Sequence, residues 1–280
     1  MGFFLTVLAI DLVLAALWLR LLYGLQHYRR EKAQRGTLAA FALFGLISVP
    51  AAFLLYSVGY TLFGGLLIPS PYAVGMFLEE FLVVGPVEEL AKFTVFFLAA
   101  RIMNSVKEPR DAVLQACSVA LAFAAVENFF YANRYESVSL LLERSLHAVL
   151  GHMSFAGIWG YAAGVVLYTR RVGNNGYGFS LAAAALFVSA GFHGMFNFLI
   201  DLGRFDLALS QDVITVSLSL VILRHLDGLS PYRRYPLNKW KTATIAIRDA
   251  LKVNPGSFVL HSRIAVYYLY GGDLENARRH

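Results

Sequence analysis

The residues best suited to chemistry are two adjacent carboxylates, Glu88 and Glu89, followed by Lys92. Apolar runs flank them on both sides, and each ionisable group inside a membrane costs roughly 2.5–3.5 kcal/mol on insertion scales. Lys92 lies three residues after Glu89 and four after Glu88, so in a helix it can pair with one carboxylate and leave the other for chemistry. Pro86 predicts a break just before the pair, which places both carboxylates in the first turn. The structural alternative is a charge-balanced helix break without activity.

The composition indicates which elements must hold these groups. Of the 280 residues, 58% are hydrophobic and only 15% are charged, and the mean hydropathy is +0.58. Soluble domains carry nearer to 25% charged residues, and apolar runs of about 20 residues recur along the chain. We therefore predict an all-α, polytopic membrane protein. The net charge of +6 comes from basic residues in short loops beside apolar runs, which indicates contact with anionic lipid rather than nucleic acid.

The hydropathy pattern predicts seven spans in residues 1–230. They are Phe3–Leu25, Thr37–Leu62, Met76–Met103, Asp111–Tyr131, Arg144–Tyr168, Phe179–Leu202 and Leu207–Leu223. The first span is followed by basic residues and preceded by none, as Arg29, Arg30, Lys32 and Arg35 show. This bias predicts an integral protein of the cell membrane with its N-terminus outside and its C-terminus in the cytoplasm. The polar turn at 173–176 lies between the fifth and sixth spans. A second acidic pair, Glu79 and Glu80, is expected at the outer interface rather than in the active site.

The pattern changes to a soluble amphipathic helix from Lys239 onward. Residues 239–280 resemble part of a tetratricopeptide repeat, with small residues such as Ala243 and Ala250 where two helices would pack, and Pro255 starting the next unit. One such unit cannot bury its own face, so either the natural protein continues or the partial repeat docks elsewhere. We expect this cytoplasmic tail to recruit a protein partner.

Further polar residues lie inside three other predicted spans, at positions Glu127, Asn128, His152, His193 and Asn197. With a rise of about 1.5 Å per residue, these spans and the Glu89 span carry their ionisable groups about 18–27 Å from their inner ends. All four groups thus lie in the outer half of a hydrocarbon core of about 30 Å. Unrelated structural polar residues would not be expected to share one depth, so we predict a single site.

Carboxylates, histidines and an amide at one depth favour acyl hydrolysis by activated water. A buried glutamate can take a proton from water and return it to a leaving amine. His193 and Asn197 can donate hydrogen bonds to the oxyanion that forms on a peptide carbonyl. The sequence has no HExxH motif, so we favour a mechanism that requires no cofactor. The alternative is a Zn²⁺ ion held by Glu127, His152 and His193.

Four ordered motifs between Met76 and Leu202 carry a family resemblance. They are EExxK at Glu88–Lys92, FxxxE at Phe123–Glu127 followed by Asn128, Arg144 with His152 and the Gly160…Gly164 run, and HxxxN at His193–Asn197. In these motifs the chain resembles the PrsW family of intramembrane proteases, distant relatives of the type II CAAX prenyl proteases. The resemblance implies catalytic roles for Glu88, Glu89, Glu127, His152, His193 and Asn197, supported by Lys92, Asn128 and Arg144.

The chain departs from the two related patterns at three positions. Lys92 and Glu127 stand where the prenyl proteases carry Arg and His, which separates the chain from that branch. Asn197 stands where members of the PrsW family carry Asp, so it is not expected to act as a base. The resemblance implies cleavage of single-span membrane proteins, such as anti-sigma factors, near the outer face.

Two function classes compete with a protease that uses glutamate-activated water. One is a Zn²⁺-dependent intramembrane metalloprotease, which metal analysis and chelator sensitivity would separate from the first. The other is a non-enzymatic proton-coupled transporter or membrane scaffold, since buried Glu and His also build proton relays. The spans show no inverted repeat with paired broken helices, which disfavours a transporter.

Overall fold

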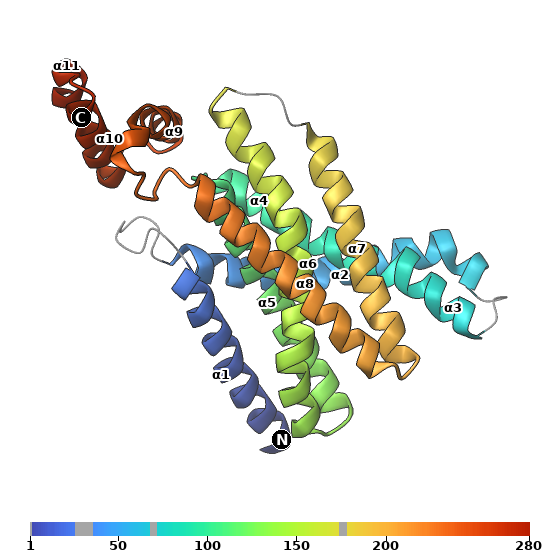
Figure 1. The fold of residues 1–280 in the computed structure, drawn as a ribbon. Coiled ribbons are helices and arrows are strands. Elements are labelled where there is room, and N and C mark those ends of the chain that lie inside the picture. Colours follow the sequence, from blue (N-terminus) through green and yellow to red (C-terminus); the bar gives the residue numbers. More distant parts are fainter. Residues whose placement is uncertain (1, 26–35, 68–71, 174–177) are drawn as a thin grey trace.

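The computed structural model describes residues 2–25, 36–67, 72–173 and 178–280. Within these ranges the chain is built from helices joined by short turns, without β-strands (Figure 1). The membrane region contains α1 (Gly2–Leu25), α2 (Thr37–Leu67), α3 (Tyr72–Glu79), the π-helix η2 (Glu80–Val84), α4 (Gly85–Ile102), α5 (Pro109–Arg134), α6 (Val138–Arg171), α7 (Phe179–Asp201) and α8 (Phe205–Leu229). The tail contains the 3₁₀ turn η3 (Leu237–Lys239), α9 (Trp240–Val253), α10 (Phe258–Tyr270) and α11 (Leu274–Arg278).

Six helices of the described ranges are long and apolar enough to cross a membrane, namely α1, α2, α5, α6, α7 and α8. They coincide with six of the seven predicted spans, which confirms the all-α polytopic class. The basic loop with Arg29, Arg30, Lys32 and Arg35 lies outside the described residues, as do residues 68–71 and 174–177.

The remaining span, Met76–Met103, is divided among α3, η2 and α4. The chain does not break at Pro86 as predicted, since Val84 and Gly85 keep right-handed helical backbone angles. Instead the helix widens before the proline, and the Gly85 N–H reaches the carbonyl oxygen of Glu80, one residue beyond an α-helical bond. The π-turn places Pro86 at the start of α4. A proline lacks a backbone N–H, and at this position of a helix no N–H is needed.

Helices α5 and α6 form the centre of the membrane region and bury most of their residues. Small residues allow their backbones to approach closely, as in other membrane helix pairs. A Cβ atom added at Gly164 would lie 2.6 Å from the Pro109 carbonyl oxygen, and one at Gly160 would lie 2.7 Å from the Ala116 Cβ. The glycines of the Gly160…Gly164 run therefore serve helix packing.

A second close contact brings α7 against the π-helix. A Cβ atom at Gly85 would lie 2.6 Å from the Ala190 carbonyl oxygen, and one at Gly194 would lie 2.6 Å from the Glu80 carbonyl oxygen. Because Gly85 precedes the acidic pair by three residues and Gly194 follows His193, this contact sets the spacing between the carboxylates and the histidine.

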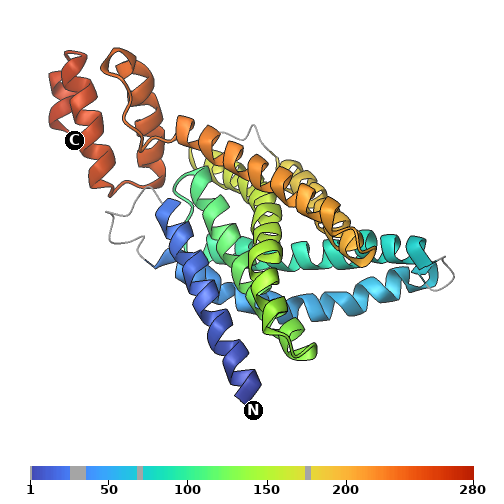
Figure 2. The ribbon, with the colours of Figure 1, turned by 60° about the horizontal axis from the view of Figure 1, so that its bottom comes forward.

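The tail forms a small helical unit beyond the end of α8 (Figures 1 and 2). Its own apolar core includes Ala243 and Ala250, and also Tyr232 and Tyr235 from the segment that joins it to α8. Gly271 lies against the Trp240 ring, where an added Cβ would come within 2.8 Å of a ring carbon. Small residues thus stand at the helix contacts, while the tetratricopeptide assignment stays a prediction.

Candidate functional site

Helix α4 directs Glu88, Glu89 and Lys92 into the protein interior, where each is buried. The Lys92 ammonium lies 2.8 Å from Glu89 Oε1 and 3.4 Å from Glu88 Oε2, as their helical spacing predicts. It also lies 4.3 Å from the centre of the Phe123 ring, a favourable place for a cation. Lys92 is fully buried, so its charge is balanced by the acidic pair rather than by water.

Helix α6 contributes His152, which connects Lys92 to Glu127 on α5. The Lys92 ammonium lies 2.9 Å from His152 Nδ1, and His152 Nε2 lies 2.8 Å from Glu127 Oε2. Because an ammonium can only donate, the neutral ring accepts at Nδ1 and donates from Nε2 to Glu127. Arg144 pairs with the other oxygen of Glu127 at 3.0 Å and donates to Asn128 Oδ1 at 3.0 Å. Arg144 and Asn128 thus support Glu127.

Helix α7 contributes His193, which contacts both carboxylates of the acidic pair. Its Nδ1 lies 2.9 Å from Glu89 Oε1, and its Nε2 lies 3.6 Å from Glu88 Oε2. The second oxygen of Glu89 accepts a 2.8 Å hydrogen bond from the Trp159 indole. The structure therefore brings Glu88, Glu89, Lys92, His152 and His193 into one network, with Glu127 at its edge, as the shared depth predicts.

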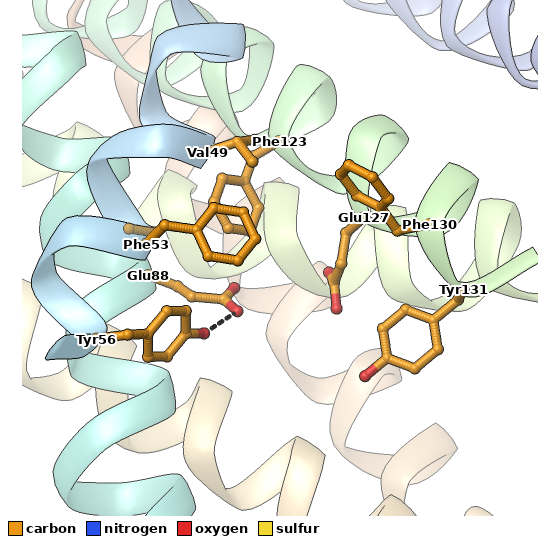
Figure 3. Close-up of a pocket in the computed structure, with 9 residues that line it drawn as sticks. Val49, Phe53, Tyr56, Glu88, Phe123, Glu127, Phe130 and Tyr131 are labelled. Carbon is orange, nitrogen blue, oxygen red and sulfur yellow. Dashed lines mark hydrogen bonds between the residues drawn. The ribbon is translucent and has the colours of Figure 1, made fainter. Parts of the chain in front are cut away.

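The two carboxylates of the pair have different surroundings. Glu89 is fully buried beneath Lys92, His193 and Trp159. Glu88 instead lines two adjoining cavities and accepts a 2.7 Å hydrogen bond from the Tyr56 hydroxyl of α2 (Figure 3). Of the two, Glu88 is the one that a molecule in the cavities can reach.

The larger cavity has a volume of about 620 Å³ and a mixed polar and aromatic lining. Its lining includes Tyr56, Tyr60, Glu80, Glu88, Glu127, Tyr131, Tyr135, Arg144, Asn197 and Asp201. Asn197 lies on the wall of this cavity together with Glu80. Glu79 accepts a 2.6 Å hydrogen bond from Tyr60.

Several residues at the site were not among the sequence-predicted ones, namely Tyr56, Trp159 and Glu80. Tyr56 and Trp159 lie in apolar spans, where aromatic residues are common, so nothing in the sequence separates them from ordinary core residues. Glu80 was not included in the predicted site because the sequence analysis expected it at the outer interface of the membrane. In the structure it lines the larger cavity together with Glu88.

A sequence profile described as "PrsW family intramembrane metalloprotease" matches residues 33–224 of the chain. The chain belongs to the PrsW family. It is also similar to a protein named "Protease PrsW" from Geobacillus kaustophilus (strain HTA426), with 32% identity over 124 residues. That match covers 44% of this chain, and the chain spans about half the length of the curated relative. No solved structure matches the chain.

Membership of the PrsW family confirms the resemblance inferred from the four motifs. All four motifs fall inside the matched range. Membership of this family also makes the chain an integral membrane protein of a protease family. The relation to the CAAX prenyl proteases stays a prediction.

The family description implies a metal, and the donor atoms of the site fit one. Ligand atoms of Glu88, His152 and His193 lie within 4.8 Å of one another, and two histidines with one carboxylate form a known Zn²⁺ ligand set. Metal-binding histidines commonly donate their other N–H to a carboxylate, as His193 Nδ1 is placed to do with Glu89 Oε1. The metal ligands predicted from the sequence were Glu127, His152 and His193, whereas the group in the structure contains Glu88 in place of Glu127.

Proposed function

We propose that this chain is an intramembrane endopeptidase that cleaves single-span membrane proteins with water activated by Glu88. The observation that carries the proposal is that Glu88 lines two cavities and also contacts the network of buried charges through Lys92. A carboxylate at such a surface can accept a proton from water, and the polar cavity gives water a route to it.

The reaction then follows from the groups around Glu88. Water attacks the carbonyl carbon of the substrate peptide while its proton moves to the Glu88 carboxylate. Glu88 returns that proton to the leaving nitrogen as the C–N bond breaks, so the carboxylate is regenerated. Glu89 and Lys92 hold the site in one charge arrangement, since their mutual pairing leaves Glu88 only the longer 3.4 Å contact with Lys92.

A Zn²⁺-dependent form of the same hydrolysis is the alternative, because the description of the family names a metalloprotease. Glu88, His152 and His193 would hold the ion, which would supply Lewis-acid polarisation of the scissile carbonyl. Glu127, which lines the cavity beside His152, would then be a carboxylate placed to accept the proton of water. Both ring nitrogens of His152 are engaged, so metal binding would replace one of those contacts.

A reconstituted cleavage assay tests the proposal. The purified protein in lipid vesicles is incubated with a pool of single-span reporter proteins, beside a variant carrying both Glu88→Gln and Glu89→Gln. We expect cleavage by the unaltered protein, full loss in the double variant and near-normal cleavage by His147→Ala, because His147 lines neither cavity. Cleavage by the double variant would refute glutamate-activated hydrolysis.

Metal analysis separates the two mechanisms. Retention of activity after chelation, with no stoichiometric metal in the purified protein, supports the metal-free form. One tightly bound Zn²⁺ per chain that is lost in both His152→Ala and His193→Ala supports the alternative. We also propose that the cut lies near the outer face and that the tail binds a cytoplasmic protein, as the loop charges and the tail helices suggest.

A further inference from the structure

Helices α2 and α5 pack closely along the first half of α2 and separate toward its C-terminal end. At the crossing, a Cβ atom added to Gly45 would lie 2.5 Å from the Val119 carbonyl oxygen, so the two backbones are in contact. One side of this crossing is closed, since Phe41 is fully buried there. On the other side Phe53 is 63% exposed, and both ribbon views show the end of α2 and α3 directed away from the α5–α6 turn (Figures 1 and 2).

A slot with a volume of about 240 Å³ lies between the diverging helices. The walls are mostly apolar and come from both helices, with Val49, Ala52, Phe53 and Tyr56 on α2 and Phe123, Glu127, Phe130 and Tyr131 on α5. Glu88 of α4 closes the inner end (Figure 3). Phe130, like Phe53, is more than half exposed, so the slot leads from the lipid-facing surface to Glu88.

The dimensions of the slot select the form of its occupant. An α-helix with its side chains is about 10–12 Å across, and a space of 240 Å³ is too small to take one. A short extended segment would instead place its apolar side chains against Phe53, Phe123 and Phe130. Unpaired peptide groups are costly in a bilayer, and the Tyr56 hydroxyl and Glu88 offer partners at the inner end.

We propose that the slot between α2 and α5 is the lateral entrance by which an unwound apolar segment of a single-span substrate reaches Glu88. The inference rests on the proposed protease function and adds the route and form of the substrate. Water reaches the same carboxylate through the adjoining larger cavity, which has the more polar lining and shares Phe53 and Tyr56 with the slot. The two cavities share Glu88, so substrate and water meet at that carboxylate.

Photo-crosslinking tests the entrance without requiring cleavage. A benzophenone amino acid is placed at Phe53, at Phe130, or at the control position Phe187, which is 81% exposed on α7. Each protein also carries Glu88→Gln, so that bound reporters are not consumed, and is irradiated with single-span reporters that carry a helix-destabilising Gly-Pro pair. We expect labelling from Phe53 and Phe130 at least about fivefold above Phe187. Equal labelling from Phe187, or none from Phe53, overturns the proposal.

A removable bridge across the slot gives a second test. Val49→Cys and Phe130→Cys, at positions that line the slot and are not among the lining of the larger cavity, are combined in a Cys117→Ala background and joined by a bifunctional thiol reagent. The matched controls are the two single-cysteine proteins treated identically. Bridging should abolish cleavage of membrane-spanning reporters reversibly, while a short soluble peptide is still hydrolysed through the larger cavity. Undiminished reporter cleavage by the bridged protein overturns the entrance. If no protein cleaves any reporter, the protease proposal fails, and the crosslinking result alone decides the entrance.

Discussion

Glu88 and Glu89 are neighbours on one helical turn, but their side chains have different surroundings. Their side chains diverge by about 100° around α4, so one faces the cavities and the other faces Trp159 and His193. Lys92 lies closer to Glu89 than to Glu88, which leaves the cavity-facing carboxylate more weakly paired. Chemical roles within the pair therefore follow from which side of the helix each residue occupies.

Single substitutions in the pair should separate these roles. Glu88→Gln keeps the shape of the side chain and removes its basicity, so turnover should fall by at least about 10²-fold. Glu89→Gln leaves Lys92 and His193 only their longer contacts with the Glu88 carboxylate, so it should lower both turnover and thermal stability. The measurements are kcat on a reporter and the unfolding midpoint in detergent. Stability losses as large in Glu88→Gln as in Glu89→Gln would contradict the assigned roles.

Tyr56→Phe should weaken catalysis without disturbing the fold. The change removes only the hydroxyl that donates to Glu88 Oε1 at 2.7 Å, while the ring remains on the slot wall. Loss of one such positioned donor should lower kcat about 10-fold or more, with an unchanged unfolding midpoint. Tyr60→Phe is the matched control, since that hydroxyl bonds Glu79 rather than Glu88. A lower KM with unchanged kcat in Tyr56→Phe would argue against the role.

At the scale of elements, glycine contacts fix how the site-bearing helices meet. Gly160 and Gly164 join α6 to α5, which sets His152 against Glu127. Gly85 and Gly194 join η2 and α4 to α7, which sets Glu89 against His193. Helices in lipid associate through close packing rather than through the hydrophobic effect, so these contacts carry much of the stability.

Gly164→Ala should therefore destabilise the membrane region. The added Cβ would lie 2.6 Å from the Pro109 carbonyl oxygen, so α5 and α6 must separate, at about 1–3 kcal/mol. Gly191→Ala on α7 is the control, because no atom of the described residues lies within 4 Å of its added Cβ, and the substitution should be neutral or stabilising. Unfolding midpoints in detergent compare the two. Equal midpoints would show that the α5–α6 contact tolerates expansion.

The whole molecule combines a membrane region that carries the site with a tail that has its own core. All site residues precede α9, and the contacts between the tail and the other helices are few. The tail core extends to Tyr232 and Tyr235, ahead of the change in sequence pattern at Lys239. A cut at Lys239 would expose both tyrosines, so the physical boundary of the tail lies closer to Ser230.

Removing the tail should leave hydrolysis of a reporter largely intact. A protein that ends after Ser230 keeps the hydrogen bond from Ser230 to Glu108 and exposes none of the tail core. A protein that ends after Asn238 retains Tyr232 and Tyr235 without their partners and should aggregate more. Cleavage rate and monodispersity distinguish the two. Complete inactivity of a well-folded protein ending after Ser230 would make the tail part of the catalytic unit.

The orientation of the whole chain is also open to measurement. The positive charges at 27–36, 104–110 and 170–178 and after residue 224 predict that these segments face the cytoplasm. A reporter enzyme fused after Leu226 should be active only on the cytoplasmic side, and one fused after Glu136 only outside. Outside activity of the fusion after Leu226 would overturn the seven-span arrangement.

Sequence alone predicted the helical class and six of the spans that the structure contains, and it grouped Glu88, Glu89, Glu127, His152 and His193 in one predicted site. Apolar run lengths and the cost of buried charge are local properties, so they can be read without tertiary structure. Three features depended on tertiary contacts: the π-turn that replaces the break at Pro86, the roles of Tyr56 and Trp159, and the position of Asn197 on the cavity wall with Glu80. These features follow from how helices distant in sequence rotate and approach one another, and periodicity within a single helix does not encode that.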